Sequence, residues 1–248
     1  MKITFLGTGD SCDPHRKNVS VLIEDSGYTH MLDCGFSSTH GYLSRSAQTQ
    51  LDTVWISHFH GDHFFGLPQL ILHLNMQKRT EPLAILSGIH GEEKILNALH
   101  LAYPELATKL SFSLDFIELQ PGTIRQHNGL SWQCAPVIHS QSAHSLRISS
   151  DTKSLYYSGD GKAMNESAEL MQNCDLVIHE AFSLKSNTPY HSSIDECLQV
   201  IKGLSISMLA LVHLNQETRE ILNESSAISG KQENTTVFFP KDDDELIL

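Results

Sequence analysis

The stretch that most constrains this chain is "SHFHGDHFFG", residues 57–66, which packs three histidines and an aspartate into ten positions. It follows directly on the apolar segment "LDTVWIS", which predicts a buried strand over 51–57. The next segment, "LPQLILHLNMQ", predicts a helix over 67–77 with Pro68 in its first turn. The titratable cluster is therefore expected on a loop that joins a strand to a helix.

The spacing of these side chains is typical of metal ligands. His58 and His60 are two positions apart, so on an extended segment both imidazoles point the same way. Asp62 and His63 follow at the turn into the helix. Imidazole and carboxylate suit zinc, and the lack of cysteine among them leaves manganese or iron open. Two ions about 3.5–4 Å apart would activate water and stabilise the entering and leaving oxygens of a hydrolysis.

Three later residues of metal-binding type each follow an apolar run, where a strand would expose them at a sheet edge: His139, Asp160 and His213. Taken singly, each has an ordinary interpretation as a turn former or a core histidine, and Asp62 as a helix cap. Together with the early cluster they predict one metal site. Other histidines stand alone in their segments and are predicted to be packing or surface residues: His30, His73, His90, His100 and His127.

Composition limits the alternatives. The 248 residues carry 17 Lys+Arg against 29 Asp+Glu, and a net charge of -12 weakly disfavours a polyanionic partner such as nucleic acid. The five cysteines form no CxxC pair, which argues against a disulfide framework and a thiolate zinc site. The start "MKITFLGTGD" is unlike a signal peptide, and no apolar run is long enough for a membrane span. We therefore expect a soluble, cytoplasmic protein that does not contact a membrane.

The remaining pattern predicts an α/β layered architecture with two sheets and outer helices, in one domain over 1–248. Further strands are expected over 2–6, 18–24, 29–35, 82–88, 116–122, 129–139, 145–151, 154–160, 174–181 and 208–214, and two short ones within 236–248. Further helices are expected over 91–103, 165–173, 193–204, with Ser193 as the cap, and 216–228.

Several stretches resemble the metallo-β-lactamase superfamily, and within it the ribonuclease Z-like branch. They are "FLGTG", "MLDCG", "ISHFHGDHFFGLPQL", "YSGDG", "DLVIHEA" and "HSSIDE", which occur in the family's order from residue 1 to about 215. The resemblance implies an αββα sandwich of two mixed β-sheets with outer helices. It also implies a dinuclear zinc site between the sheet edges.

Carried over to this chain, the resemblance implies two zinc ions, the first bound by His58, His60 and His139, the second by Asp62, His63 and His213, with Asp160 as the bridge. It makes Asp62 a candidate base toward the bridging hydroxide. It pairs Glu180 with His191 as a proton-delivering couple near the leaving group, and a carboxylate that orients an imidazole is a sensible general acid. The implied reaction is phosphodiester hydrolysis.

The chain departs from that family where substrate would be met. Members that process tRNA carry a long arm before the bridging aspartate, but here only 20 residues separate His139 from Asp160. The family's "DCGEGTQ" is "DCGFSST" at 33–39. Arg147 and Lys162 flank the predicted site, where each either meets a phosphate or is a solvated surface charge. His144 either lines the pocket or is structural, and the structural interpretation is favoured.

The expected substrate is a phosphodiester, either a small molecule or an RNA 3′ end. Hydrolysis of a lactone, thioester or carboxylic ester is the alternative reaction, because the same fold can present the same nucleophile to a carbonyl. A non-catalytic ligand-binding module is the alternative class; it predicts lost ligands, and none of the seven is missing. A homodimer could form through "FFGLPQLILHL", although burial in the core accounts for that segment more simply.

Overall fold

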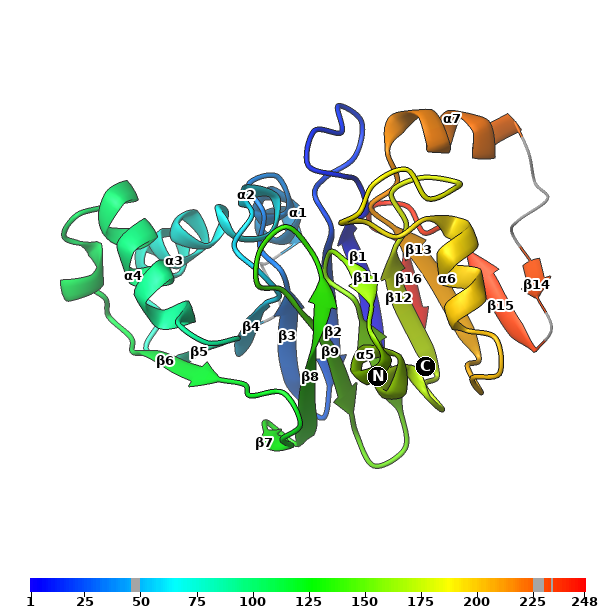
Figure 1. Ribbon diagram of the computed structural model, residues 1–248. Helices are drawn as coiled ribbons and strands as arrows, with labels where there is room; N and C mark the ends of the chain where they lie inside the picture. Colours follow the sequence, from blue (N-terminus) through cyan, green and yellow to red (C-terminus); the bar gives the residue numbers. More distant parts are fainter. Residues whose placement is uncertain (46–49, 225–229, 233) are drawn as a thin grey trace.

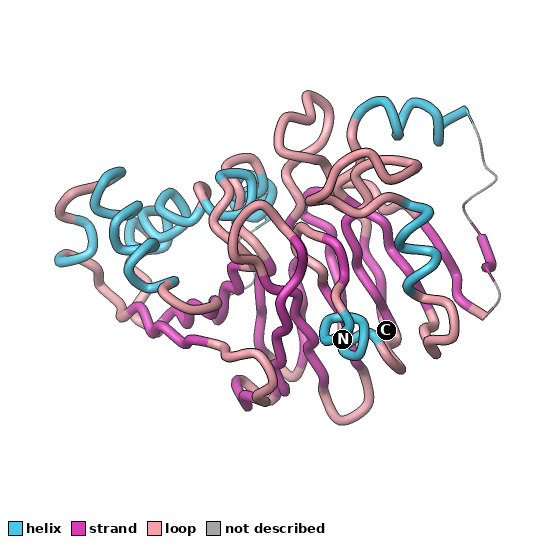
Figure 2. Tube along the Cα trace, viewed as in Figure 1, coloured by secondary structure: helices cyan, strands magenta, loops and turns pink. Residues whose placement is uncertain are grey.

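The computed structural model describes residues 1–45, 50–224, 230–232 and 234–248, and in them two β-sheets stack face to face with helices outside (Figure 1). Figure 2 shows that long loops from several elements meet at one end of the strands. The predicted sandwich of two mixed sheets with outer helices is confirmed. A single domain over 1–248 stays a prediction.

The first sheet has the strand order β16-β1-β2-β3-β4-β5-β6. Its strands are β1 (Lys2–Gly7), β2 (Ser20–Asp25), β3 (Tyr28–Leu32), β4 (Thr53–Ile56), β5 (Leu83–Ser87), β6 (Leu114–Glu118) and β16 (Glu245–Ile247). From β3 to β6 all neighbours are parallel, so these strands end at one edge of the sheet. The loop that begins at Ser57 leaves β4 at that edge.

The second sheet has the order β11-β8-β9-β10-β12-β13-β15-β14, with β7 (Arg125–His127) paired to β8. Its other strands are β8 (Leu130–Ile138), β9 (His144–Ser149), β10 (Ser154–Tyr157), β11 (Lys162–Ala163), β12 (Leu176–Glu180), β13 (Met208–Val212), β14 (Gly230–Gln232) and β15 (Thr235–Phe238). β10, β12 and β13 are parallel, and β8 runs the same way because β9 is antiparallel to both β8 and β10. His139, Asp160 and His213 therefore follow strands that end at one edge.

The space between the sheets is filled by alternate residues of each strand, as the two-residue period of a strand requires. Leu32 and Trp55 face inward from the first sheet, and Trp132, Tyr157 and Ile178 face them from the second; all are fully buried. Chain neighbours such as Met31, Val54 and Val177 belong instead to the outer clusters beneath the helices. Both sheets are thus apolar on both faces, which explains why the strands read as nearly continuous apolar runs.

The helices are α1 (Ser38–Arg45), α2 (Gly61–Phe64), α3 (Leu67–Met76), α4 (Gly91–Ala102), the 3₁₀ helix η1 (Leu106–Thr108), α5 (Asn165–Met171), α6 (Ile194–Val200) and α7 (Gln216–Glu224). Leu67, Leu70 and Ile71 of α3 are fully buried against the first sheet. The apolar segment proposed for a dimer interface is thus largely core. The predicted cap of α6 is confirmed, because the Ser193 hydroxyl accepts from the Glu196 backbone N–H.

Six described elements were not predicted: α1, α2, η1, β7, β11 and β14. The sequence of α1, "STHGYLSR", is polar and contains a glycine, so its period is weak, and burial of Tyr42 fixes it to the core. The helix predicted over 216–228 is confirmed as far as Glu224, and 225–228 lie outside the described residues. Among the helices of the described ranges, none has both the length and the apolar character needed to cross a membrane.

Candidate metal centre

One group of metal-binding side chains gathers at the loop after β4. Nitrogen and oxygen atoms of His58, His60, His139 and Asp160 lie within 4.8 Å of one another. The Nδ1 atom of His60 is 3.1 Å from the Nε2 atoms of both His58 and His139. The His58 Nε2 atom is 3.9 Å from Asp160 Oδ2. Residues from the loop after β4, the end of β8 and the end of β10 thus meet at one point.

A second group lies beside the first and shares a residue with it. Its members are Asp62, His63, Asp160 and His213, again within 4.8 Å of one another. The His63 Nε2 atom is 3.3 Å from Asp62 Oδ2 and 3.2 Å from Asp160 Oδ1. The His213 Nε2 atom is 3.4 Å from Asp62 Oδ2 and 3.3 Å from Asp160 Oδ2. Asp160 thus has the position that a residue bridging two ions would need.

Hydrogen bonds behind the imidazoles fix which ring nitrogen faces inward. His139 Nδ1 donates to the Tyr190 carbonyl at 3.1 Å. His58 Nδ1 donates to the Ser57 hydroxyl at 3.0 Å, because that hydroxyl itself donates to Asp33 at 2.8 Å. The inward Nε2 atoms of His58 and His139 then carry no proton, and the lone pairs of both atoms point at His60. His60 Nδ1 can donate one hydrogen bond at most, so protons cannot satisfy both lone pairs. A bound cation can accept both.

A buried aspartate that the sequence interpretation missed holds the second group. Asp33 is fully buried and follows β3. It accepts from the Ser57 backbone N–H at 2.7 Å, from the Tyr157 hydroxyl at 2.6 Å and from His63 Nδ1 at 2.7 Å. The last bond turns His63 Nε2 toward Asp62. A carboxylate behind a ligating histidine fixes its tautomer and makes it a better ligand.

The electrostatics of the two groups fit divalent cations. Burial holds the pKa of His58 well below its usual value, so this imidazole is neutral, as a ligand must be. Burial alone would raise the pKa of Asp160, but His213 and His63 hold it well below its usual range. His63 Nε2 and Asp160 Oδ1 are buried and, although 3.2 Å apart, form no aligned hydrogen bond with each other or with another group among the described residues. The donors are nitrogen and oxygen only, which suits Zn²⁺, Mn²⁺ or iron.

Glu180 and His191 lie next to the second group. Glu180 is buried, and its carboxylate accepts from the backbone N–H groups of Gly161 at 3.1 Å, Phe182 at 3.2 Å and Ser192 at 2.7 Å. The His191 Nδ1 atom is 3.5 Å from Glu180 Oε1 and 4.0 Å from Asp160 Oδ2. The fixed carboxylate thus faces an imidazole at the border of the metal centre.

Aromatic rings hold His191 in this place. Its ring stacks on that of His213, with centroids 5.6 Å apart and an interplanar angle of 10°. Phe182 lies 5.1 Å from the same ring. His191, His213 and Glu180 are also close enough to share a cation, although His213 already belongs to the second group. The structure thus brings together all nine residues singled out from the sequence, whose separate roles stay predictions.

The two flanking cations do not face the centre as free charges. Arg147 donates to the carbonyls of Leu170 and Gln172 at the end of α5. Lys162 pairs with Glu196 at 2.8 Å. His144 is 8% exposed, and its backbone N–H donates to the Ser57 carbonyl, which ties β9 to the loop of the first group.

The chain between the third histidine and the bridging aspartate is a plain hairpin. β9 and β10 are antiparallel, and the Ser150 backbone N–H donates to the Lys153 carbonyl at their turn. All of residues 140–159 are described. This segment therefore carries no inserted arm, as predicted.

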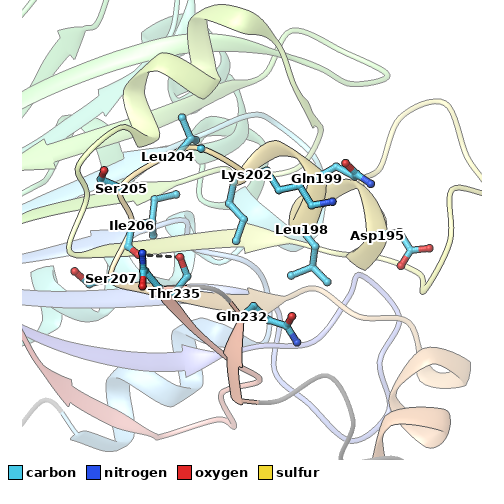
Figure 3. A pocket seen from close by; sticks show the side chains of 13 residues that line it. Asp195, Leu198, Gln199, Lys202, Leu204, Ser205, Ile206, Ser207, Gln232 and Thr235 are labelled. Atoms are coloured by element: carbon cyan, nitrogen blue, oxygen red, sulfur yellow. Dashed lines mark hydrogen bonds between the residues drawn. The ribbon is translucent and has the colours of Figure 1, made fainter.

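A separate pocket of about 920 Å³ lies at the end of α6, beside β14 and β15 (Figure 3). Leu198, Leu204 and Ile206 give it an apolar side, and Asp195 and Lys202 a charged one. Its lining contains neither histidine nor cysteine. It therefore lacks the chemistry that distinguishes the two groups above.

Known proteins similar in sequence match almost the whole chain. Ribonuclease Z of Staphylococcus epidermidis is 24% identical over 98% of this chain and 99% of its own length. Ribonuclease BN of Proteus mirabilis is also 24% identical, over 92% of this chain and 95% of its own length. These relatives confirm the ribonuclease Z-like resemblance.

Solved structures agree on the fold. The short form of human tRNase Z superimposes with a TM-score of 0.79 at 22% identity, covering 100% of this chain and 99% of its own. The metallo-beta-lactamase fold protein YhfI of Bacillus subtilis gives a TM-score of 0.81 at 18% identity, covering 99% and 98%. The family model described as Anti-Pycsar protein Apyc1 matches residues 1–236, almost the whole chain. The chain therefore belongs to the Anti-Pycsar protein Apyc1 family and has the metallo-β-lactamase fold.

Proposed function

We propose that this metal-dependent hydrolase of the metallo-β-lactamase fold is a phosphodiesterase that acts on small phosphodiesters, cyclic nucleotides first among them. The Apyc1 family favours a cyclic nucleotide phosphodiesterase. Yeast PDE1 superimposes with a TM-score of 0.73, which supports the common fold. The ribonuclease names of the sequence relatives favour a phosphodiester bond over a carbonyl ester.

The observation that carries the proposal is the Glu180–His191 pair at the border of the metal centre. Hydrolysis of a phosphodiester expels an alkoxide, which needs a proton as the bond breaks. A histidine beside a buried carboxylate is well suited to deliver that proton. Hydrolysis of an activated ester or thioester has less need of such a donor, so the pair favours phosphorus over a carbonyl.

Seven of these residues would bind the two metal ions. His58, His60 and His139 would hold one divalent ion, Asp62, His63 and His213 the other, and Asp160 both. Bound there, the ions would supply Lewis acidity and compensate the negative charge that develops on a phosphate.

The other side chains move or orient protons. Asp62 is the candidate acceptor for the proton of the attacking water, and His191 protonates the departing oxygen. Glu180 keeps the His191 imidazole turned toward the centre, because its own oxygens are fixed by three backbone N–H groups.

Two features favour a small substrate over tRNA. The 140–159 hairpin lacks an arm that could grip a large RNA, and Arg147 and Lys162 are engaged within the protein. Recognition of an RNA through several phosphates uses clusters of cations. Processing of an RNA 3′ end is the second candidate function, because the ribonuclease relatives match over nearly their full length.

A substrate panel tests the proposal. Protein loaded with Zn²⁺ or Mn²⁺ is assayed on bis(p-nitrophenyl) phosphate, 3′,5′-cyclic nucleotides, precursor tRNA, a lactone and a thioester, with chelated protein as the control. We expect diesterase activity that disappears on chelation and is greatest on the cyclic nucleotides. Lactone or thioester hydrolysis without any diesterase activity contradicts the proposal, as does protein that binds no metal and cleaves nothing.

A further inference from the structure

Several large apolar side chains that neighbour metal-binding residues, in the chain or through backbone contacts, are exposed to solvent. The exposed fractions are 52% for Phe36, 60% for Phe65, 47% for Ile138 and 46% for Tyr190. We call these four residues the apolar rim. Scattered exposed apolar residues are ordinary, but a group of them around a site marks a contact surface.

Two rim residues are joined directly to the first metal group and the proton donor. Ile138 precedes His139 in the chain. Tyr190 precedes His191, and its carbonyl accepts the 3.1 Å hydrogen bond from His139 Nδ1. The backbone of Tyr190 is therefore part of the support of the centre, while its ring makes no ring contact with another aromatic residue among those described.

The other two rim residues, Phe36 and Phe65, adjoin backbone contacts of the loop that carries Asp62. The Phe65 ring covers Gly61, where an added Cβ would be 2.8 Å from the ring carbon Cδ2. Gly35, which precedes Phe36, packs so closely on the Asp62 carbonyl that a Cβ there would collide with it. Both exposed rings thus start from backbone that touches the metal-binding loop.

Two lysines, Lys162 just after Asp160 and Lys17, are engaged in ion pairs within the protein. Lys162 is held by Glu196 at 2.8 Å and by the Ser186 hydroxyl at 2.9 Å. Lys17 pairs with Asp243 at 3.0 Å. The phosphate charge of a substrate is thus left to the metal centre, and its flat or apolar portion is left to the rim.

We propose that the aromatic members of the rim, Phe36, Phe65 and Tyr190, bind the base of a nucleotide by stacking while its phosphodiester lies at the metal centre. This inference rests on the proposed function and names the part of the substrate that determines specificity. It also gives a reason for the altered 33–39 segment, where Phe36 replaces the glutamate of the ribonuclease Z-like pattern. An uncharged ring suits a base, which presents a π-face and little charge.

The test compares two substrates that differ only in the base: adenosine 3′,5′-cyclic monophosphate and the base-free ribose 3′,5′-cyclic phosphate. The measured quantity is the ratio of their kcat/KM values in metal-loaded protein. Stacking contributes about 1–3 kcal/mol per base, so Phe36→Ala or Tyr190→Ala should lower this ratio about 5-fold to 150-fold, mainly through KM. Tyr190→Phe, which keeps the ring, should restore most of it. Leu101→Ala, at an 86% exposed position on α4, is the matched control.

Binding of a non-hydrolysable phosphorothioate cyclic nucleotide by calorimetry gives a second readout that does not depend on turnover. The two alanine substitutions should weaken binding of this nucleotide by the same factor by which they lower the kcat/KM ratio. Equal loss on both substrates, or an unchanged ratio, overturns the stacking role, and circular dichroism separates that result from unfolding. If wild-type protein cleaves neither substrate but hydrolyses a lactone, the proposed function itself has failed.

Discussion

Buried histidines lie at both ends of the space between the sheets, and their surroundings differ. At the metal centre, His63 and His213 face Asp62 and Asp160 at 3.2–3.4 Å. Toward the other end of the strands, His30 is fully buried, and neither of its ring nitrogens has a hydrogen-bond partner within the described part of the chain. Its nearest aromatic neighbour is Trp132, at 5.3 Å between ring centroids.

The carboxylates make the difference between the two regions. Burial opposes a charge on His213, but Asp160 and Asp62 raise its pKa to about 9. Burial likewise opposes a charge on His30 and, together with His127, lowers its pKa to about 4, because the Asp25 carboxylate offsets this only in part. A buried imidazole alone is thus a packing residue, as predicted for His30, and becomes a candidate ligand only where acidic partners converge on it.

Removal of the shared carboxylate should have the largest effect. Asp160→Asn takes one ligand from both metal groups, so we expect kcat/KM to fall by at least about 1000-fold, beyond the 10- to 100-fold of a supporting residue. Metal content, measured by mass spectrometry after dialysis, should fall below two ions per chain. Added Zn²⁺ should raise the Tm of wild type more than that of the variant.

The control for this substitution is Asp151→Asn, at the exposed turn between β9 and β10. It should keep two ions and the wild-type Tm response. Retention of two tightly bound ions by the Asp160→Asn protein would mean that the two groups do not form one centre.

Loss of the proton donor should have the next largest effect. His191→Ala should reduce hydrolysis of a cyclic nucleotide about 100-fold to 10,000-fold, because the alkoxide leaving group then departs without a proton. Bis(p-nitrophenyl) phosphate expels a stable phenolate and should be much less affected. Metal content should stay at the wild-type level. A similar loss on both substrates would assign His191 to the metal centre instead.

The histidine at the other end should affect stability instead of activity. Because the pKa of His30 is about 4 in the folded protein and near its usual 6.5 when unfolded, the unfolded chain binds the proton first as pH falls. Stability from this group is complete above pH 6.5 and is lost as the pH drops toward 4, by up to about 3 kcal/mol.

Urea unfolding of metal-free protein at pH 7 and pH 4 measures this loss. His30→Phe, which keeps a ring against Trp132, should remove most of the difference in stability between pH 7 and pH 4, while His40→Gln at an exposed position should not. An equal loss in wild type and His30→Phe would show that other groups cause the acid sensitivity.

The sequence predicted those parts of the site that depend on pattern and order. The HxHxDH spacing and the residues after apolar runs, such as His139 and His213, identified the groups because strand ends place side chains at one sheet edge. Glu180 and His191 look like ordinary loop residues, and only the family resemblance singled them out. The main strands were recognisable because both faces of each sheet are buried.

What could not be predicted depends on contacts between distant segments. The polar helix α1 has little period of its own. Arg147 and Lys162 were candidates for phosphate contacts on sequence position alone, and their partners come from α5 and α6. Asp33 lies in the family stretch "MLDCG", but nothing in the local sequence shows that it faces Ser57, His63 and Tyr157. Its one signal is an aspartate at the end of an apolar strand.

Substitution of Asp33 should have the smallest effect on the metal centre, because its carboxylate supports a ligand and is not one itself. Asp33→Asn keeps the shape but removes the charge behind His63, so His63 Nδ1 loses a charged acceptor and the ring a fixed tautomer. We expect metal affinity to fall about 10-fold to 100-fold, measured by competition with a chelator. Tyr157→Phe removes one 2.6 Å hydrogen bond to the same carboxylate without touching His63, and should cost less affinity. Equal losses in the two variants would mean that Asp33 acts by packing, and the contrast between the two buried histidine regions would then depend on Asp62 and Asp160 alone.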